Sequence, residues 1–278
     1  MPSIMTNGIL THYEIQGTGP AIVFVSGLGG TAAYWQPQIA AFAKDFTVLT
    51  YDQRGSGTTE HPAGPYSIET LVDDLFCLLS ELKLERPILI GHSTGGAIGQ
   101  ILAARHPDLL AGMVMYASWA KSDRHFNWCF RMRRALLVGS TVEEYVHGSA
   151  LFLYPPDHVR ANAEVLSPAL LASAAKFPQR EVVLSRIDAI MAHDAIACLP
   201  LIAIPTLVLC AQDDVLTPPY QSRLLAEGIA GSELKIVPQG GHSLSETEPA
   251  LFNQITFGFV AAIHRPANGG AYEQPRIA

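Results

Sequence analysis

The segment that most constrains the fold is Gly91-His92-Ser93-Thr94-Gly95, which directly follows an apolar run at residues 87–90. A strand, a sharp turn carrying a serine and a helix together predict a nucleophile elbow, whose strained turn exposes the serine hydroxyl. Glycines on both sides of Ser93 fit this geometry, because a side chain there would collide with the neighbouring strand or helix. Residues 95–105 then form a pattern of small and apolar residues that predicts a helix. The sequence therefore predicts an enzyme in which Ser93 is the nucleophile.

Strand-like apolar runs alternate with helical stretches, which is the pattern of a mostly parallel sheet flanked by helices. The expected strands lie at residues 21–25, 47–51, 87–90, 113–116, 205–210 and 234–237, and the clearest helix at 68–84. With 278 residues, 49% of them hydrophobic, the chain can build one large α/β domain with an insertion. Residues 120–196 break the alternation and predict a helical lid, inserted between core segments 1–119 and 197–265. The tail at 266–278 is expected to be disordered.

Two loops that follow strands supply a base and an acid for Ser93. One strand leads into Asp213 and Asp214, and another leads into a glycine-flanked loop that carries His242. Serine needs a neighbour to accept its proton at neutral pH, and a buried carboxylate fixes the tautomer of the accepting imidazole. His242 is therefore the predicted base. The residues themselves leave the choice between Asp213 and Asp214 open, and a solvated turn is the other role that such a pair of acids can have.

The loop at residues 26–30, Ser-Gly-Leu-Gly-Gly, carries few side chains that could block its backbone amides. We predict that the N–H groups of Leu28 and Thr94 form an oxyanion hole. The loop has neither the spacing of a dinucleotide fingerprint nor the Gly-Lys-Ser/Thr of a P-loop, which disfavours nucleotide binding.

These motifs, together with the turn at residues 51–57, occur in the order found in the α/β-hydrolase superfamily, which the chain resembles over about residues 5–265. The resemblance implies the α/β-hydrolase fold. It also favours Asp214 as the acid, because the family places an acid four residues before a proline. Segments 25–30, 34–35, 51–55, 151–155 and 210–214 are further similar to the aminoacrylate or carbamate hydrolases of pyrimidine degradation. Many superfamily members have histidine in place of Ser26, and some of the pyrimidine group lack the elbow serine, so Ser93 favours covalent catalysis here.

The predicted lid should determine the substrate, because the core supplies the chemistry and inserted helices enclose the pocket. The candidate substrate-binding residues are Tyr34, Trp35, Trp119, Arg131, Phe152, Tyr154 and Ser243. An arginine such as Arg131 can bind a carboxylate bidentately. Ordinary packing is the alternative role for the aromatic residues, and surface solvation is the alternative for the arginine. Asp52 and Arg54 are interpreted as an internal ion pair.

Composition narrows the expected partners and location. The formal net charge is −7, from 18 basic and 25 acidic residues, which disfavours nucleic acid. Four cysteines without CxxC spacing predict reduced thiols in a cytoplasmic protein. No apolar stretch reaches the roughly 18 residues of a membrane span, and the N-terminus lacks the pattern of a signal peptide. We expect a small-molecule substrate and a homodimer as partners, with no metal and no cofactor.

The predicted function is a cofactor-independent serine hydrolase that forms an acyl-enzyme on Ser93, with His242 as general base. Its substrate would be a small ester, amide or carbamate, derived from a ring compound or a xenobiotic. Three alternatives use the same fold: a carbon–carbon bond hydrolase of ring-fission products, a cofactor-free oxygenase or perhydrolase, and a ligand receptor without turnover. Serine in place of aspartate at the elbow disfavours dehalogenation.

Overall fold

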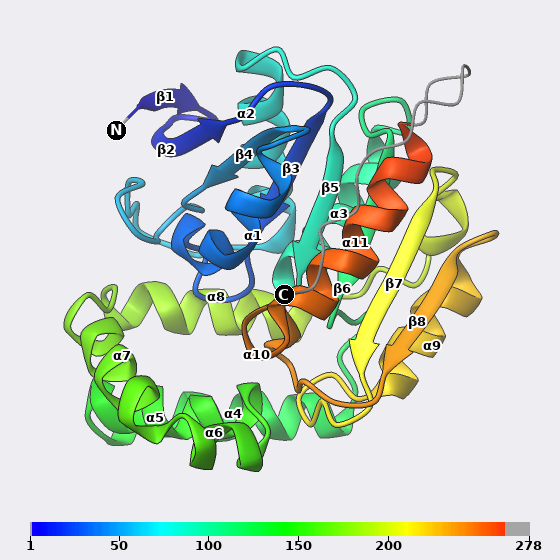
Figure 1. Cartoon of the computed structure of the whole chain (residues 1–278). Helices are drawn as coiled ribbons and strands as arrows, with labels where there is room; N and C mark the ends of the chain where they lie inside the picture. The colour runs from blue at the N-terminus through cyan, green and yellow to red at the C-terminus, as the bar shows by residue number, and fades with distance from the viewer. Residues whose placement is uncertain (1, 265–278) are drawn as a thin grey trace.

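The computed structural model describes residues 2–264, which are built around one eight-stranded sheet (Figure 1). The strands are β1 (Ser3–Thr6), β2 (Ile9–Gln16), β3 (Ala21–Val25), β4 (Thr47–Tyr51), β5 (Ile88–His92), β6 (Gly112–Tyr116), β7 (Thr206–Ala211) and β8 (Glu233–Val237). Their order is β1-β2-β4-β3-β5-β6-β7-β8, with every pair from β4 to β8 parallel. This is the α/β-hydrolase fold, so the predicted fold class and all six predicted strands are confirmed.

The antiparallel hairpin of β1 and β2 was missing from the sequence prediction. Its turn is Asn7-Gly8, with positive φ angles of 45° and 77°. Asn-Gly is the preferred pair for a two-residue type I′ turn between antiparallel strands. That dipeptide was therefore the signal that could have located the hairpin.

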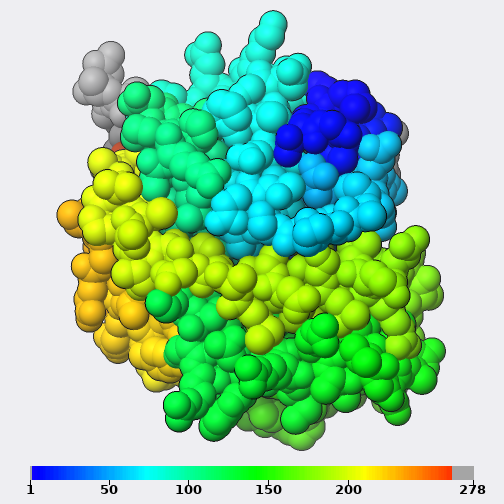
Figure 2. Space-filling view, turned by 180° about the vertical axis from the view of Figure 1, so that it is seen from behind, coloured from blue at the N-terminus to red at the C-terminus, as the bar shows by residue number. Residues whose placement is uncertain are grey.

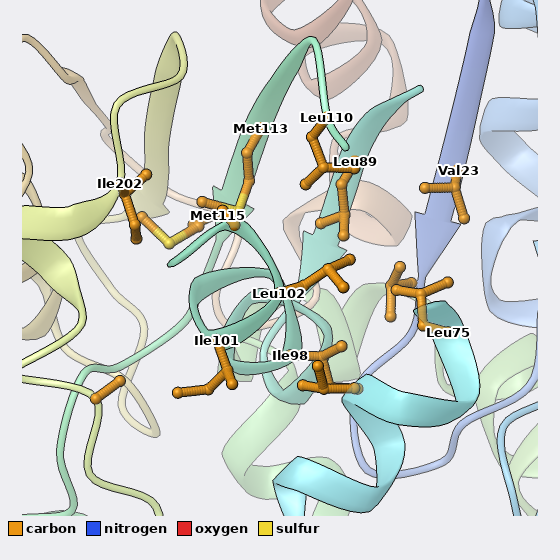
Figure 3. Close-up of a cluster of buried hydrophobic side chains, with 14 of the residues drawn as sticks. Val23, Leu75, Leu89, Ile98, Ile101, Leu102, Leu110, Met113, Met115 and Ile202 are labelled. Atoms are coloured by element: carbon orange, nitrogen blue, oxygen red, sulfur yellow. The ribbon is translucent and has the colours of Figure 1, made fainter. Parts of the chain in front are cut away.

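Helices cover both faces of the sheet, because each central strand is apolar on both sides. On one face, α2 (Ile68–Glu81) and α3 (Thr94–Arg105) pack against side chains such as Val23 and Leu89 (Figure 3), and α9 (Pro219–Gly228) packs against β7 and β8. On the other face, α1 (Gln36–Phe42) and α11 (Pro249–Ile263) pack against Ile22, Phe24 and Ile88. Neighbouring residues of β3 thus alternate between the two cores, as the two-residue period of a strand requires.

The interpretation of Asp52 and Arg54 as an ion pair is wrong. Arg54 Nη2 lies 2.6 Å from Oδ1 of Asp74, a buried residue of α2. The carboxylate of Asp52 instead accepts hydrogen bonds from the backbone N–H groups of Ala32 and Thr58, at 2.9 Å each. Because backbone donors in the surrounding turns already occupy Asp52, the guanidinium reaches across to the helix. Helix α2 ends at Glu81, three residues before its predicted end.

Five helices form a layer at the end of the sheet toward which the parallel strands point (Figure 1). This helical layer consists of α4 (Arg124–Gly139), α5 (Val142–Leu153), α6 (Pro156–Ala161), α7 (Ala163–Ala175) and α8 (Arg180–Ala192). It occupies the segment in which the lid was predicted. Three short elements complete the fold: η1 (Ala32–Trp35), η2 (Leu199–Leu201) and α10 (Leu244–Thr247). The tail predicted at 266–278 lies outside the described residues, and within 2–264 no helix has the length and apolarity to cross a membrane.

Candidate active site

Ser93 occupies the sharp turn between β5 and α3, so the predicted strand, turn and helix are all present. Its φ and ψ angles are 52° and −112°, a conformation that residues with a side chain rarely adopt. A β-carbon on Gly91 would lie 2.5 Å from the carbonyl carbon of Gly95, and one on Gly95 would collide with the carbonyl oxygen of Val25. The glycines therefore allow strand, elbow and helix to approach closely enough to hold the serine in this turn.

His242 and Asp214 meet in the buried interior beyond the ends of β8 and β7. His242 Nδ1 lies 2.9 Å from Asp214 Oδ2, and both side chains are buried. Asp214 Oδ1 also accepts from the N–H groups of Leu216 and Thr217, at 2.8 and 2.9 Å. An ionised carboxylate only accepts hydrogen bonds, so the histidine proton lies on Nδ1. Nε2 is left as the basic nitrogen of the ring.

The structure distinguishes Asp213 from Asp214. The carboxylate of Asp213 accepts from the backbone N–H groups of Gly241, at 2.9 Å, and Gly240, at 3.3 Å. It therefore anchors the glycine loop that carries His242, whereas Asp214 contacts the imidazole itself.

The loop predicted to form the oxyanion hole lies against the elbow. A β-carbon on Gly27 would be 3.3 Å from Cβ of Ser93. Within residues 2–264, neither the N–H of Leu28 nor that of Thr94 donates a hydrogen bond. Leu28 follows Gly27 and Thr94 follows Ser93, so two unpaired donors are available next to the serine.

A buried aromatic network, which the sequence analysis missed, fixes the main chain at His242. The ring of His92 stacks between Tyr34 and Tyr116, with centroid distances of 4.6 and 4.7 Å. The carbonyl oxygen of His242 accepts from Tyr116 Oη at 2.7 Å and lies 3.0 Å from His92 Nε2. Burial, and the neighbouring His242, lower the pKa of His92 well below its usual range, so His92 is a neutral donor. Tyr116 ends the strand beside β5, a position that could have indicated its role.

Four of the residues predicted to bind substrate border this site. Tyr34 accepts from Ser245 Oγ at 2.8 Å and stacks on His92, as described above. The N–H of Ser243 donates to the carbonyl of Leu153 at 3.0 Å. Tyr154 donates to the carboxylate of Glu246 at 2.9 Å, and Phe152 packs at the edge of the apolar cluster inside the helical layer. Burial raises the pKa of Glu246, which no sequence motif had indicated.

The other three candidates are two packed tryptophans and one exposed arginine. Trp35 and Trp119 have no exposed surface and pack within two different hydrophobic clusters. Arg131 is exposed on α4, whereas Arg133 is buried. These positions match the alternative roles given above, which were packing for the two tryptophans and surface solvation for the arginine.

Within residues 2–264, no three histidine, cysteine, aspartate or glutamate side chains converge into a possible metal site. All four cysteines are free thiols. A groove of about 450 Å³ lies between residues 65–69 and α8, and it includes none of the residues around Ser93.

Comparisons with known proteins identify the family and the fold. Residues 22–255 match the model of the "Alpha/beta hydrolase family". The "Putative carbamate hydrolase RutD" of Azorhizobium caulinodans is 37% identical over 252 residues, covering 91% of this chain and 95% of that protein. The protein of the same name in Agrobacterium fabrum is 40% identical over 255 residues, covering 90% and 97%. The crystal structure of the enol-lactonase from Burkholderia xenovorans LB400 superposes with a TM-score of 0.84 at 31% identity, covering 94% of this chain and 100% of that chain.

Proposed function

Since this chain belongs to the alpha/beta hydrolase family, we propose that it is a serine hydrolase acting through an acyl-enzyme on Ser93, with His242 as general base. The observation that carries the proposal is the buried pair of His242 and Asp214 beside the elbow. The ring of His92, the residue before Ser93, lies 4.8 Å from the ring of His242. The basic imidazole thus approaches the strained turn that presents the serine.

In the first half-reaction, Ser93 Oγ attacks the substrate carbonyl carbon and its proton passes to His242 Nε2. Asp214 stabilises the resulting imidazolium through Nδ1. The negative charge on the carbonyl oxygen is accepted by the N–H groups of Leu28 and Thr94, and each preorganised donor of this kind contributes about 3 kcal/mol. His242 then protonates the leaving group. Water, activated by the same imidazole, releases the acid in the second half-reaction.

We assign the helical layer the role of a lid over this site. The end of α5 contacts the loop of His242 directly, because the carbonyl of Leu153 accepts from Ser243 and a β-carbon on Gly241 would lie 2.8 Å from Pro155. Leu28 from the oxyanion loop and Leu216 from the acid loop pack into the apolar cluster of the layer. Substrates would be selected in this contact zone, where Phe152 and Tyr154 are the side chains to test.

Small carbamates are the first substrate class to test, because the relatives with 37% and 40% identity carry the name carbamate hydrolase. Cyclic esters are the second class, because the enol-lactonase structure shares 31% identity across nearly the whole of both chains. Both reactions need the same serine, base and oxyanion donors, so relative kcat/KM values on matched carbamates and lactones would separate them.

The decisive experiment is labelling with a fluorophosphonate, followed by intact mass measurement. Ser93 Oγ would displace fluoride from phosphorus, adding one phosphonyl group to the wild type and none to Ser93→Ala. His242→Ala should slow labelling and lower turnover of p-nitrophenyl acetate by about 10⁴- to 10⁶-fold, because members of a triad act as a unit.

Two results would contradict the proposal. One is a folded wild-type protein that gains no adduct, and the other is a Ser93→Ala variant that is labelled as fast as the wild type. Circular dichroism of each variant establishes that the compared proteins are folded.

A further inference from the structure

Arg186, in the middle of α8, is a buried cation whose hydrogen bonds all reach the core. It is 2% exposed. Nε donates to the carbonyl of Leu28 at 3.0 Å, Nη1 to the carbonyl of Arg54 at 2.8 Å, and Nη2 to Oε1 of Gln53 at 2.6 Å. No carboxylate within residues 2–264 forms an ion pair with it. Burial lowers its pKa to about 10, so the side chain remains charged at neutral pH.

Burying a charge that has only neutral acceptors costs free energy. The groups that Arg186 binds therefore indicate the role of this side chain. Nη2 also lies 3.5 Å from the carbonyl oxygen of Gly27, the same oxygen that accepts from the N–H of Gly30 at 3.0 Å within the loop. This oxygen and the N–H of Leu28 belong to the same trans peptide, in which they point in opposite directions. With the oxygen held toward α8, the N–H of Leu28 points away from α8. A cation at the carbonyl end also polarises the peptide and strengthens its N–H as a donor.

Gln53 links Arg186 to Ser26, the first residue of the loop. Its Nε2 donates to the carbonyl of Ser26 at 2.7 Å, while its Oε1 accepts from Arg186. The carbonyl oxygens of three consecutive residues, Ser26, Gly27 and Leu28, are therefore bound directly or through one side chain to Arg186. Figure 2 shows α8 in yellow-green between the cyan part of the core and the green helices of the layer, so the contact joins the two parts.

We propose that Arg186 is a positioning residue, which holds the peptide between Gly27 and Leu28 in the orientation that turns the N–H of Leu28 toward the substrate oxyanion. The inference rests on the proposed function and adds to it a coupling between α8 and the oxyanion hole. Displacement of α8 would release the loop as well as uncover the site.

Arg180, on the same helix, supplies a matched control. Its Nη1 and Nη2 donate to the carbonyls of Leu137 and Ser140, at 2.8 and 2.9 Å. These acceptors lie within the helical layer or in the residue that follows α4. Like Arg186→Met, Arg180→Met removes hydrogen bonds from an arginine of α8 to main-chain carbonyls. Unlike Arg186→Met, it leaves the contacts of the loop at residues 26–30 intact.

The test compares wild type, Arg186→Met, Arg186→Lys and Arg180→Met in turnover of p-nitrophenyl acetate and in inhibition by an alkyl trifluoromethyl ketone. Ser93 Oγ would add to the ketone carbon, its proton would pass to His242, and the carbonyl electron pair would become an oxyanion in the hole. In Arg186→Met, kcat and ketone affinity should both fall about 10- to 100-fold, less than the loss of a donor itself, with KM nearly unchanged. Lysine should give an intermediate loss, and Arg180→Met none.

A merely structural role would raise KM and lower the melting temperature without a matching loss of ketone affinity, and that pattern would overturn the inference. Equal losses in Arg180→Met and Arg186→Met would do the same. If Arg186→Met does not fold, a folded Arg186→Lys with wild-type kcat and ketone affinity counts against the proposal. A wild type unlabelled by fluorophosphonate would refute the serine mechanism itself, whereas a labelled wild type with unaffected variants would refute only the role of Arg186.

Discussion

At the residue scale, Asp214 and Asp213 are adjacent acids whose carboxylates face different partners. Asp214→Asn should lower kcat/KM by about 10⁴-fold, because an amide cannot keep the Nδ1 tautomer of His242 or stabilise its cation. Asp213→Asn should have a far smaller effect, because the amide oxygen still accepts a bond from Gly241. Steady-state kinetics of the two variants on one ester provide the measurement, and the reverse order of effects would exchange the two roles.

This choice between neighbours marks the limit of what the sequence could predict about the site. The loop at residues 26–30, Ser93 and His242 each follow a predicted strand. A parallel sheet brings the carboxyl ends of its strands together, so these residues are expected to lie close to one another. The two acids follow the same strand, so their order depends on the turn in which the N–H groups of Leu216 and Thr217 bind Asp214. The backbone conformation of that turn cannot be predicted from hydrophobic periodicity, because a turn has no repeating pattern of apolar residues.

A second prediction at this scale concerns Tyr116, whose hydroxyl donates to the carbonyl of His242 and accepts from the N–H of Ser245 at 3.1 Å. Tyr116→Phe leaves buried main-chain groups without this partner, so the free energy of unfolding should fall by about 1–3 kcal/mol and kcat should decrease. Tyr51 is the control, because its buried hydroxyl has no hydrogen-bond partner within residues 2–264. Urea unfolding should show little change for Tyr51→Phe, and an equal loss in both variants would count against the network.

At the scale of elements, the sequence predicted every parallel strand, including β8 at one edge of the sheet, and missed the antiparallel hairpin of β1 and β2. Strands β3 to β7 form continuous apolar runs because helices cover both of their faces. The β1–β2 hairpin lies at one edge of the sheet and mixes buried with exposed positions, so its pattern is weak. Arg186 was missed for a related reason, because nothing in the charge pattern of α8 distinguishes a buried arginine from a solvated one.

The junction of β5 and α3 gives a prediction at this scale. Gly95→Ala would place a β-carbon against the carbonyl oxygen of Val25, and neither backbone can move without disturbing the sheet or the elbow. We expect the free energy of unfolding to fall by about 3 kcal/mol, at the upper end of overpacking effects. Gly29→Ala is the matched control in the oxyanion loop, because its β-carbon would meet nothing within 4 Å. Similar urea midpoints for the two variants would show that the elbow tolerates a side chain.

At the scale of the whole molecule, His193 links the helical layer to the core just after α8. It is 5% exposed, and Nε2 lies 3.4 Å from Oε1 of Gln100 on α3. Burial lowers its pKa to about 4, whereas an unfolded histidine titrates near 6.5. The unfolded chain therefore binds this proton first as the pH falls. The stabilisation from the neutral form is complete above pH 6.5 and is lost progressively between about 6.5 and 4.

Replacing His193 should therefore change the pH dependence of stability rather than only its magnitude. His193→Gln removes the titration, so its free energy of unfolding should fall less steeply than that of the wild type, by up to about 1.4 kcal/mol per pH unit in this range. Urea unfolding at several pH values between 7 and 4.5 measures the two slopes, and carboxylates that titrate in both proteins cancel in the difference. Exposed His61 is the control, and His61→Gln should keep the wild-type slope. Parallel slopes for His193→Gln and wild type would mean that the contact between layer and core tolerates a protonated His193, and that the acid sensitivity of the fold arises elsewhere.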